Sequence, residues 1–161
     1  MSTDSDKAVV KKITAPSDGQ ISTMTEWLHD WWGKSEGYSG EAVRSYLSNS
    51  FHSDRYPQTY GLFLGEKLIG MFQITMSDLF VRPDLYPWLA NVYIDEKYRG
   101  LGYGKFLLEN IGNILKDHSC IDEIYLYTTH ENLYERFGWE FVEKTDTFLS
   151  DRIQNIYRLR I

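Results

Sequence analysis

Residues 88–108 read WLANVYIDEKYRGLGYGKFLL, and this stretch decides the fold. Residues 88–94 are mostly apolar, which predicts a buried strand, and the charged turn Asp95–Lys97 ends that strand. Apolar residues then recur at helical spacing from Phe106 to Leu115. Because glycines occupy alternate positions between these two segments, the sequence predicts a strand, a glycine-rich turn and an amphipathic helix that starts inside the glycine run.

The glycine run has the properties of an anion-binding site. The first turn of a helix leaves about four backbone N–H groups without partners and carries positive partial charge. Gly100, Gly102 and Gly104 have no side chains, so phosphate oxygens can approach the backbone closely. Arg99 and Lys105 can add positive charge to the same site. The alternative interpretation is a glycine-rich helix cap that binds no ligand.

Two better-known phosphate loops do not match this run. The Walker pattern G-x-x-x-x-G-K-[ST] fails because Phe106 follows Lys105. The dinucleotide fingerprint G-x-G-x-x-G fails because the glycine after Gly102 follows two residues later, at Gly104, and not three.

The pattern that remains, Arg99-x-x-Gly102-x-Gly104 after a strand and at the start of a helix, resembles the acetyl-CoA pyrophosphate loop of the GNAT N-acetyltransferase superfamily, [RQ]-x-x-G-x-[GA]. A second segment, Asn132–Trp139, looks like that superfamily's other signature, a short helix carrying N-x-x-x-[FY]-Y-x-[KR]-x-G-[FW] variants. The two segments come in the expected order, about thirty residues apart. The resemblance covers the chain from about Leu62 to Trp139.

The resemblance implies that acetyl-CoA is the acyl donor. In the superfamily the strand before the glycine loop and the strand after the long helix splay apart, and the pantetheine arm of the cofactor pairs with the backbone of the first. Asn132 is expected to bind the pantetheine, to cap its own short helix, or both. The implied cofactor-binding residues are Val92, Tyr93, Ile94, Arg99, Gly100, Leu101, Gly102, Tyr103, Gly104, Lys105, Asn132 and Tyr134.

Periodicity and turn residues place the other elements. The expected strands are Lys7–Ile13, Thr59–Gly65, Lys67–Met76, Trp88–Ile94, Ile121–Thr129, Phe141–Lys144 and Gln154–Ile161. The expected helices start at Ser17 or Asp18 and end at Gly33, span Gly40–Ser50, run from the glycine loop to about Ser119, and begin at Asn132. Because a helix connects the strands 88–94 and 121–129, these two strands should pair in parallel.

Together with the resemblance, these elements predict an α/β fold of GNAT type. Its sheet is expected to be mixed and mostly antiparallel, with six or seven strands and a central splayed parallel pair, and to carry about four helices. The length of 161 residues fits a single N-acetyltransferase domain over residues 1–161, in which residues 1–6 form a flexible tail.

Two segments leave alternatives open. Trp31, Trp32 and Tyr38 could line an aromatic pocket for an acceptor, but tryptophans at helical spacing are more often core residues, and core is the expectation here. The stretch 77–87, with two prolines and two aspartates, is long for a loop in a compact domain, so it is expected to be functional or mobile.

Acetyl transfer to an amine needs a neutral amine, a polarised carbonyl and a proton for the departing thiolate. The resemblance points to Tyr134 as the proton donor, with simple packing beside its aromatic neighbours as the alternative. Asp78 is the first choice for a carboxylate that receives a cationic amine, and a loop charge is the alternative. The general base stays open among Asp78, His130, Glu131 and a chain of water molecules.

Composition bounds the partners. The net charge of −6 argues against nucleic acid and mildly favours a cationic substrate, although it could serve solubility alone. The single cysteine, Cys120, excludes an internal disulfide, suits a reducing cytoplasm and lies far from both signatures, so a cysteine nucleophile is not expected. The histidines and the cysteine show no metal-binding spacing. No apolar run approaches the ~20 residues that span a membrane, and no signal peptide is evident.

The sequence therefore predicts a cytoplasmic, acetyl-CoA-dependent N-acetyltransferase that moves an acetyl group to a primary amine by direct attack in a ternary complex. A small molecule or a peptide could supply the amine, and a homodimer is possible. Two alternatives remain: a non-catalytic acyl-CoA-binding sensor, and a protein-interaction module that uses the aromatic helix Gln20–Trp32. The sequence does not identify the acceptor, the oligomeric state or the use of longer acyl-CoAs.

Overall fold

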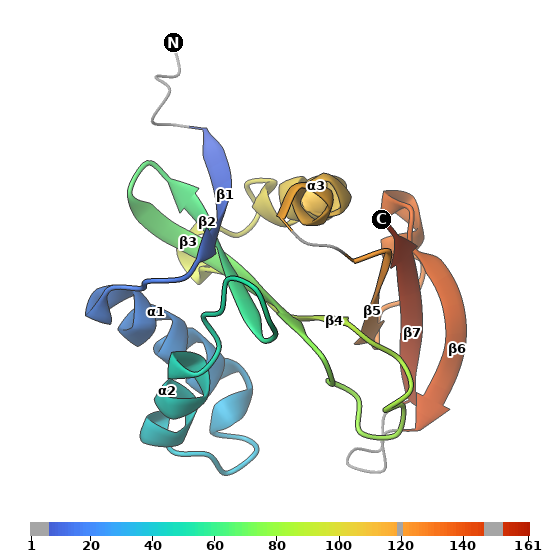
Figure 1. Ribbon diagram of the computed structural model, residues 1–161, viewed down its shortest axis with the longest axis horizontal. Coiled ribbons are helices and arrows are strands. Elements are labelled where there is room, and N and C mark those ends of the chain that lie inside the picture. Colours follow the sequence, from blue (N-terminus) through green and yellow to red (C-terminus); the bar gives the residue numbers. More distant parts are fainter. Residues whose placement is uncertain (1–6, 119–120, 147–152) are drawn as a thin grey trace. The chain divides into compact units, whose positions relative to one another are not determined.

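A computed structural model describes residues 7–118, 121–146 and 153–161 (Figure 1). The predictions for the tail 1–6 and for Cys120 lie outside these residues. The elements in chain order are β1 (Ala8–Ile13), α1 (Asp18–Leu28), the π-helical turn η2 (His29–Gly33), α2 (Gly40–Ser48), β2 (Gln58–Leu64), β3 (Lys67–Thr75), β4 (Trp88–Ile94), the 3-10 turn η3 (Glu96–Tyr98), α3 (Tyr103–His118), β5 (Glu123–Thr128), the 3-10 turn η4 (Tyr134–Phe137), β6 (Glu140–Asp146) and β7 (Ile153–Arg160).

The seven described strands form one sheet in the order β1-β2-β3-β4-β5-β7-β6. The pairs β1–β2, β2–β3, β5–β7 and β6–β7 are antiparallel, whereas β4 and β5 are parallel through Trp88 and Tyr125. The predicted mixed, mostly antiparallel sheet with a central parallel pair is therefore confirmed. Three α-helices and the short turn η4 account for the expected helices among the described residues.

The chain divides into two compact units. The first comprises Met1–Ile74 and Asn91–Tyr103, and the second comprises Thr75–Ala90 and Gly104–Ile161. The boundaries fall inside β3 and β4 and at the start of α3. Each unit has a hydrophobic core of its own, and the predicted single N-acetyltransferase domain stays a prediction.

The core of the first unit forms between its helices and its strands. Ser17 caps α1 in a capping box, because its hydroxyl accepts from the Gln20 N–H while the Gln20 side chain accepts from the Ser17 N–H. Helices α1 and α2 lie side by side (Figure 1). The shared core consists of Ile13, Met24, Trp27, Leu28, Val43, Leu47, Phe63, Leu68 and Met71.

The aromatic stripe of the first helix splits between core and surface. Trp27 is buried, as expected, but the side chain of Trp31 is 50% exposed and that of Tyr38 is 52% exposed. The expectation that Trp31 and Tyr38 are core residues is therefore wrong. The π-helical turn η2 interrupts the regular helix from His29 onwards and changes the direction in which its side chains point. Trp32 remains partly buried against the core.

Strand β3 passes close to β4 in the first unit. The N–H of Asp95 donates to the carbonyl of Ile69 over 2.8 Å. Gly70 allows this approach, because a Cβ at its position would lie 2.8 Å from the carbonyl oxygen of Tyr93. The glycine inside the predicted strand Lys67–Met76 thus has a packing role.

The second unit packs its long loop onto its own strands. Leu79 is buried with Trp88, Tyr125 and Ile156, and the indole N–H of Trp88 donates to the carbonyl of Leu85 over 2.6 Å. The loop 77–87, which the sequence left open as functional or mobile, is therefore held by its own apolar residues.

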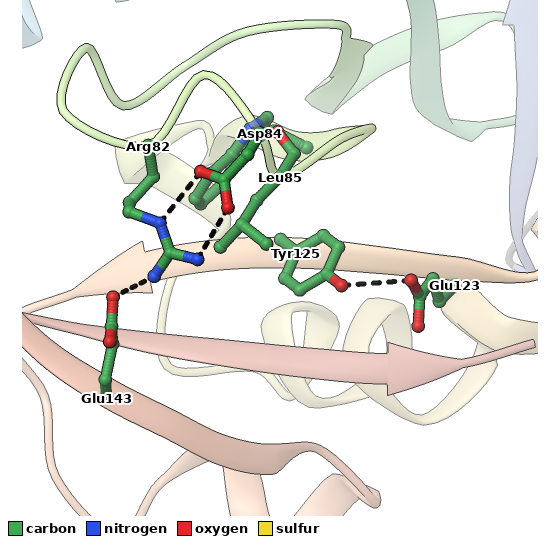
Figure 2. Close-up of polar contacts among 7 residues, drawn as sticks. Arg82, Asp84, Leu85, Glu123, Tyr125 and Glu143 are labelled. Carbon is green, nitrogen blue, oxygen red and sulfur yellow. Dashed lines mark hydrogen bonds and ion pairs between the residues drawn. The ribbon is translucent and has the colours of Figure 1, made fainter.

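Charged contacts fasten the same loop (Figure 2). The guanidinium of Arg82 makes two 2.9 Å hydrogen bonds to the carboxylate of Asp84 and a third bond to Glu143 of β6. Nearby, the Tyr125 hydroxyl donates to Glu123 over 2.9 Å (Figure 2). Arg82 thus ties the loop to β6, which lies two residues of chain beyond η4.

Candidate functional site

The glycine loop has the geometry of an anion site. Gly100 and Gly102 have φ angles of 75° and 91°, which L residues with side chains rarely adopt. A Cβ at Gly100, Gly102 or Gly104 would meet no atom within 4 Å, so the space over the loop is open. Helix α3 begins at Tyr103, inside the glycine run as predicted, and its first N–H groups lack partners within the helix.

Two basic side chains flank this loop in different ways. Arg99 folds back on the end of β4, where its Nε donates to the carbonyl of Ile94 over 2.9 Å and its Cζ lies 4.9 Å from the ring centre of Tyr93. Its terminal nitrogens carry the rest of the positive charge. Lys105 is exposed and pairs with Glu109 one turn further along α3, over 3.5 Å.

Strand β4 contains one residue with an unusual backbone conformation. Asn91 has a φ of 52°, in the left-handed region that asparagine tolerates better than most residues. The three residues after it, Val92, Tyr93 and Ile94, are the ones that the resemblance assigns to main-chain contacts with the cofactor. All three are partly exposed, while Trp88, Leu89 and Ala90 are buried.

The second signature forms the short 3-10 turn η4 in the second unit. It ends at Gly138, which has a left-handed φ of 89°. Asn132 also has a left-handed backbone, with a φ of 62°. The residue at the N-terminus of the turn is Leu133, and no side chain caps it, so the expected capping role of Asn132 is wrong. Its expected contact with pantetheine stays a prediction.

Tyr134 lies at the start of η4 among aromatic side chains. Its ring centre is 6.1 Å from that of Trp139 and 5.7 Å from that of Tyr157. Burial raises the pKa of the Tyr134 phenol above its ordinary value near 10, and a hydrogen bond with Thr128 offsets part of this rise. The phenol therefore keeps its proton at neutral pH.

The three candidates for the general base have different surroundings. Asp78 is exposed and follows the end of β3 in the loop 77–87. The His130 side chain is exposed, and the peptide groups of this residue bond to Thr128 and Asn155. The carboxylate of Glu131 forms an ion pair with Lys144 over 3.0 Å.

The predicted site residues thus fall into two groups. The first unit holds the strand and loop residues from Val92 to Tyr103 as one continuous segment. The second unit holds Gly104, Lys105, Asp78 and the η4 segment with Asn132 and Tyr134. The open space over the three glycines, the left-handed φ at two of them and the free N–H groups of α3 suit a diphosphate, so the loop fits acetyl-CoA.

Sequence reasoning missed the polar side chains that surround Asn91. Its amide contacts Trp32 of η2, Tyr46 of α2 and Gln73 of β3, and none of these contacts was expected. The available signal was an asparagine inside an otherwise apolar strand, because asparagine there is costly unless its amide has partners.

Two searches of the described residues bear on other kinds of function. No helix in the described ranges combines the length and apolar character that crossing a membrane requires. Among the same residues, no three His, Cys, Asp or Glu side chains gather in a way that could hold a metal ion.

Comparison with known proteins finds a partial match to a curated acetyltransferase. A curated spermine/spermidine N(1)-acetyltransferase of Bacillus subtilis (strain 168) is 36% identical over 64 residues, which are 37% of this chain and 42% of the relative. The match thus spans less than half of the relative's length.

Structural neighbours share the fold at low identity. A GNAT family acetyltransferase from Elizabethkingia anophelis with acetyl-CoA bound has a TM-score of 0.64 and 15% identity, covering 97% of this chain and 99% of the other. An aminoglycoside 6'-N-acetyltransferase complexed with coenzyme A has a TM-score of 0.69 and 11% identity, covering 94% and 96%.

A family model gives the decisive match. The model of the acetyltransferase (GNAT) family matches residues 21–139, which include both signatures and all the strands from β2 to β5. With the sheet order and the glycine loop already described, this match shows that the chain belongs to the GNAT acetyltransferase family.

Proposed function

We propose that this protein is an acetyl-CoA-dependent N-acetyltransferase that acts on a primary amine by direct attack in a ternary complex. The observation that carries the proposal is the glycine loop at the start of α3, with left-handed Gly100 and Gly102 and open space over both. Bound acetyl-CoA supplies an activated acetyl group as a thioester. The chain's own residues bind it, orient the amine and move the protons.

Binding of the donor rests on backbone groups. The N–H groups of the first turn of α3 would bind the diphosphate, where the helix dipole favours negative charge. The guanidinium of Arg99 would add charge at the edge of the loop, while its bond to Ile94 keeps the side chain in place. The backbone of Val92, Tyr93 and Ile94 would pair with the pantetheine arm and polarise the acetyl carbonyl.

Tyr134 would return a proton to the departing thiolate. Its raised pKa keeps the Oη protonated when the reaction begins, and its packing against Trp139 and Tyr157 holds the ring in place. A phenol with a pKa at or above about 10 can still protonate a thiolate in a site that excludes water, because the phenolate and the thiolate are both costly to hold there. Asn132 would bind the pantetheine beside it.

The acceptor is proposed to be a cationic primary amine on a small molecule or a peptide. Two of the named relatives are acetyltransferases of spermine and spermidine or of aminoglycosides, which all carry several amines, and the net charge of −6 mildly favours such substrates. Asp78 is the proposed carboxylate for the incoming ammonium and for its proton. His130 and Glu131 are the other candidates, and the carboxylate of Glu131 already pairs with Lys144.

A turnover assay tests this proposal. Purified protein is mixed with acetyl-CoA and with spermidine, kanamycin or a short peptide with a free N-terminus, and release of the CoA thiol is followed. Acetylation of at least one amine above the rate of thioester hydrolysis is the expected result. Binding of acetyl-CoA without turnover on any amine would favour a non-catalytic acyl-CoA sensor, and absence of both would favour an interaction module that uses Gln20–Trp32.

A further inference from the structure

The left-handed backbone of Asn91 coincides with a chain of hydrogen bonds in the first unit. The Asn91 Nδ2 donates to the Oε1 of Gln73 over 2.6 Å, and the Asn91 Oδ1 accepts from the indole Nε1 of Trp32 over 3.1 Å. A weaker contact of 3.4 Å joins the Asn91 Nδ2 to the hydroxyl of Tyr46. One amide thus contacts a helix turn, a second helix and a neighbouring strand.

The buried end of this series of hydrogen bonds, at Thr59 and Gln73, fixes the orientation of the Gln73 and Asn91 amides. The Thr59 hydroxyl donates to the carbonyl of Ser50 over 2.7 Å, so its oxygen is left to accept from the Nε2 of Gln73 over 3.0 Å. The Oε1 of Gln73 must then face Tyr46 and Asn91. Gln73 and Thr59 are fully buried, so reversing the Gln73 amide would leave polar atoms without partners in the core.

This order of donors and acceptors leaves one role for Asn91. Its NH2 group must face the Gln73 oxygen, and its oxygen must face the Trp32 N–H. A glutamine would be too long, and an aspartate would set two acceptors against each other at Gln73. Because a left-handed backbone is unfavourable for a residue with a side chain, the hydrogen bonds of the Asn91 amide offset the strain of its backbone.

We propose that Asn91 is a positioning residue for acetyl transfer. Its amide joins η2 and α2 to β4 at the residue before Val92–Ile94. These two elements carry exposed aromatic side chains, and β4 is the strand proposed to hold the acetyl group. The contacts of Asn91 therefore keep η2, α2 and β4 in one fixed arrangement. The inference rests on the proposed function, because Val92–Ile94 are donor-binding residues only if acetyl-CoA binds. Asn91 acts through Trp32, Tyr46 and the backbone of β4 and need not touch either substrate.

Three variants separate the side chain from the backbone. Asn91→Gly retains the left-handed conformation without strain and removes only the amide. Trp32→Phe removes the indole donor and leaves Asn91 in place. Asn49→Gly is the control, because it also removes an asparagine amide that bonds to a backbone carbonyl of α2, over 2.8 Å, outside the chain of contacts.

Two measurements test the inference. The first is steady-state kinetics with the amine that the wild type acetylates fastest in the turnover assay, and the second is the Kd for acetyl-CoA from calorimetry. Asn91→Gly should lower kcat/KM for the amine roughly tenfold to a hundredfold, since small errors in position are costly in transfer reactions. Its Kd for acetyl-CoA should stay within about twofold of the wild type, which separates acceptor positioning from donor binding. Asn49→Gly should match the wild type in both measurements.

A double-mutant cycle shows whether Asn91 acts through Trp32. Trp32→Phe should lower kcat/KM in the wild type but have little further effect in Asn91→Gly. If Asn91→Gly turns over the amine like the wild type, or if the two effects simply add, the inference is wrong while the proposed function stands. If the wild type acetylates no amine, the proposed function fails and the inference fails with it. Trp32→Phe alone supplies the comparison if Asn91→Gly unfolds.

Discussion

The surroundings of Tyr134 suit it to the role of proton donor that we propose for it. Burial raises the pKa of its phenol, and a hydrogen bond with Thr128 limits the rise. A phenol that stays protonated at neutral pH is a suitable acid and a poor base, so the environment itself favours proton donation over proton removal. The proposed base must therefore be a different residue.

Tyr134→Phe should lower kcat by about a hundredfold or more, because it removes a positioned proton donor and leaves the ring packing intact. The Kd for acetyl-CoA should change little. Tyr157→Phe is the matched control, since it removes a neighbouring phenol that donates to Glu135 over 2.9 Å. Steady-state kinetics of the two variants decide the matter, and equal losses would assign Tyr134 a packing role only.

At this scale the sequence predicted more about motifs than about partners. Tyr134 and the glycines of the loop could be identified as candidate site residues from the sequence, because their motifs are short and local. Asn91 could not, because its conformation depends on Trp32, Tyr46 and Gln73, which lie 18 to 59 residues away in the chain. The exposure of Trp31 was also missed, since the periodicity of an α-helix does not reveal a π-helical turn.

The helices and strands match the sequence prediction where apolar residues recur at a regular spacing or where glycines and prolines mark the ends of an element. Strand β4 has the predicted bounds Trp88–Ile94, and α3 begins within the glycine run. The loop 77–87 was recognised by its prolines and aspartates, but its attachment was not, because pairing of Arg82 with Glu143 joins residues that only the fold brings together. Apolar packing and the Arg82–Glu143 ion pair thus fix the loop within the second unit.

Arg82→Gln should lower the melting temperature at pH 7 and loosen the loop 77–87. The Arg82 guanidinium holds the pKa of Asp84 below its ordinary value near 3.8. A carboxylate with a lowered folded-state pKa stabilises the fold above its unfolded pKa, and this contribution is lost as the pH falls through the folded value. The difference between variant and wild type should therefore shrink below about pH 4.

Thermal unfolding at pH 7 and pH 3 measures this effect. Arg44→Gln serves as the control, because Arg44 also pairs with an aspartate, Asp18, but at 3.7 Å and on the open surface. A deficit for Arg82→Gln no larger than that of Arg44→Gln, or one that persists at pH 3, would show that Arg82 does not fasten the loop.

For the whole molecule, the parallel pairing of β4 with β5 follows from simple topology and was predicted correctly. The family follows from two short motifs and their order. The identity of the acceptor does not follow, because recognition of a small molecule depends on side chains that only the tertiary structure brings together. The net charge of −6 mildly favours a cationic acceptor but does not identify one.

The stability of the molecule should fall in alkali because of Tyr60. This side chain is fully buried, stacks on Phe72 at 4.7 Å, and burial together with Tyr56 raises its pKa to about 12. The unfolded chain ionises near pH 10 and the folded chain does not, so unfolding is favoured by up to about 3 kcal/mol between pH 10 and 12. Denaturant titrations of the wild type and Tyr60→Phe should show a steeper decline for the wild type, and parallel declines would contradict this.

The central claim is that the glycine loop at the start of α3 binds acetyl-CoA. Gly102 and Gly37 offer a matched comparison, because both have left-handed φ angles, 91° and 84°, and open space around the position of a Cβ. Alanine at either position should therefore cost about 1 kcal/mol of stability. Only at Gly102 should the added methyl group also obstruct the diphosphate.

Calorimetric titration of acetyl-CoA into the wild type, Gly102→Ala and Gly37→Ala is the most direct measurement. We predict binding of one acetyl-CoA to the wild type, equal affinity for Gly37→Ala, and at least about a tenfold weaker affinity for Gly102→Ala, as expected when a phosphate loses close contact with backbone N–H groups. No heat with the wild type, or equal losses in the two alanine variants, would contradict the account.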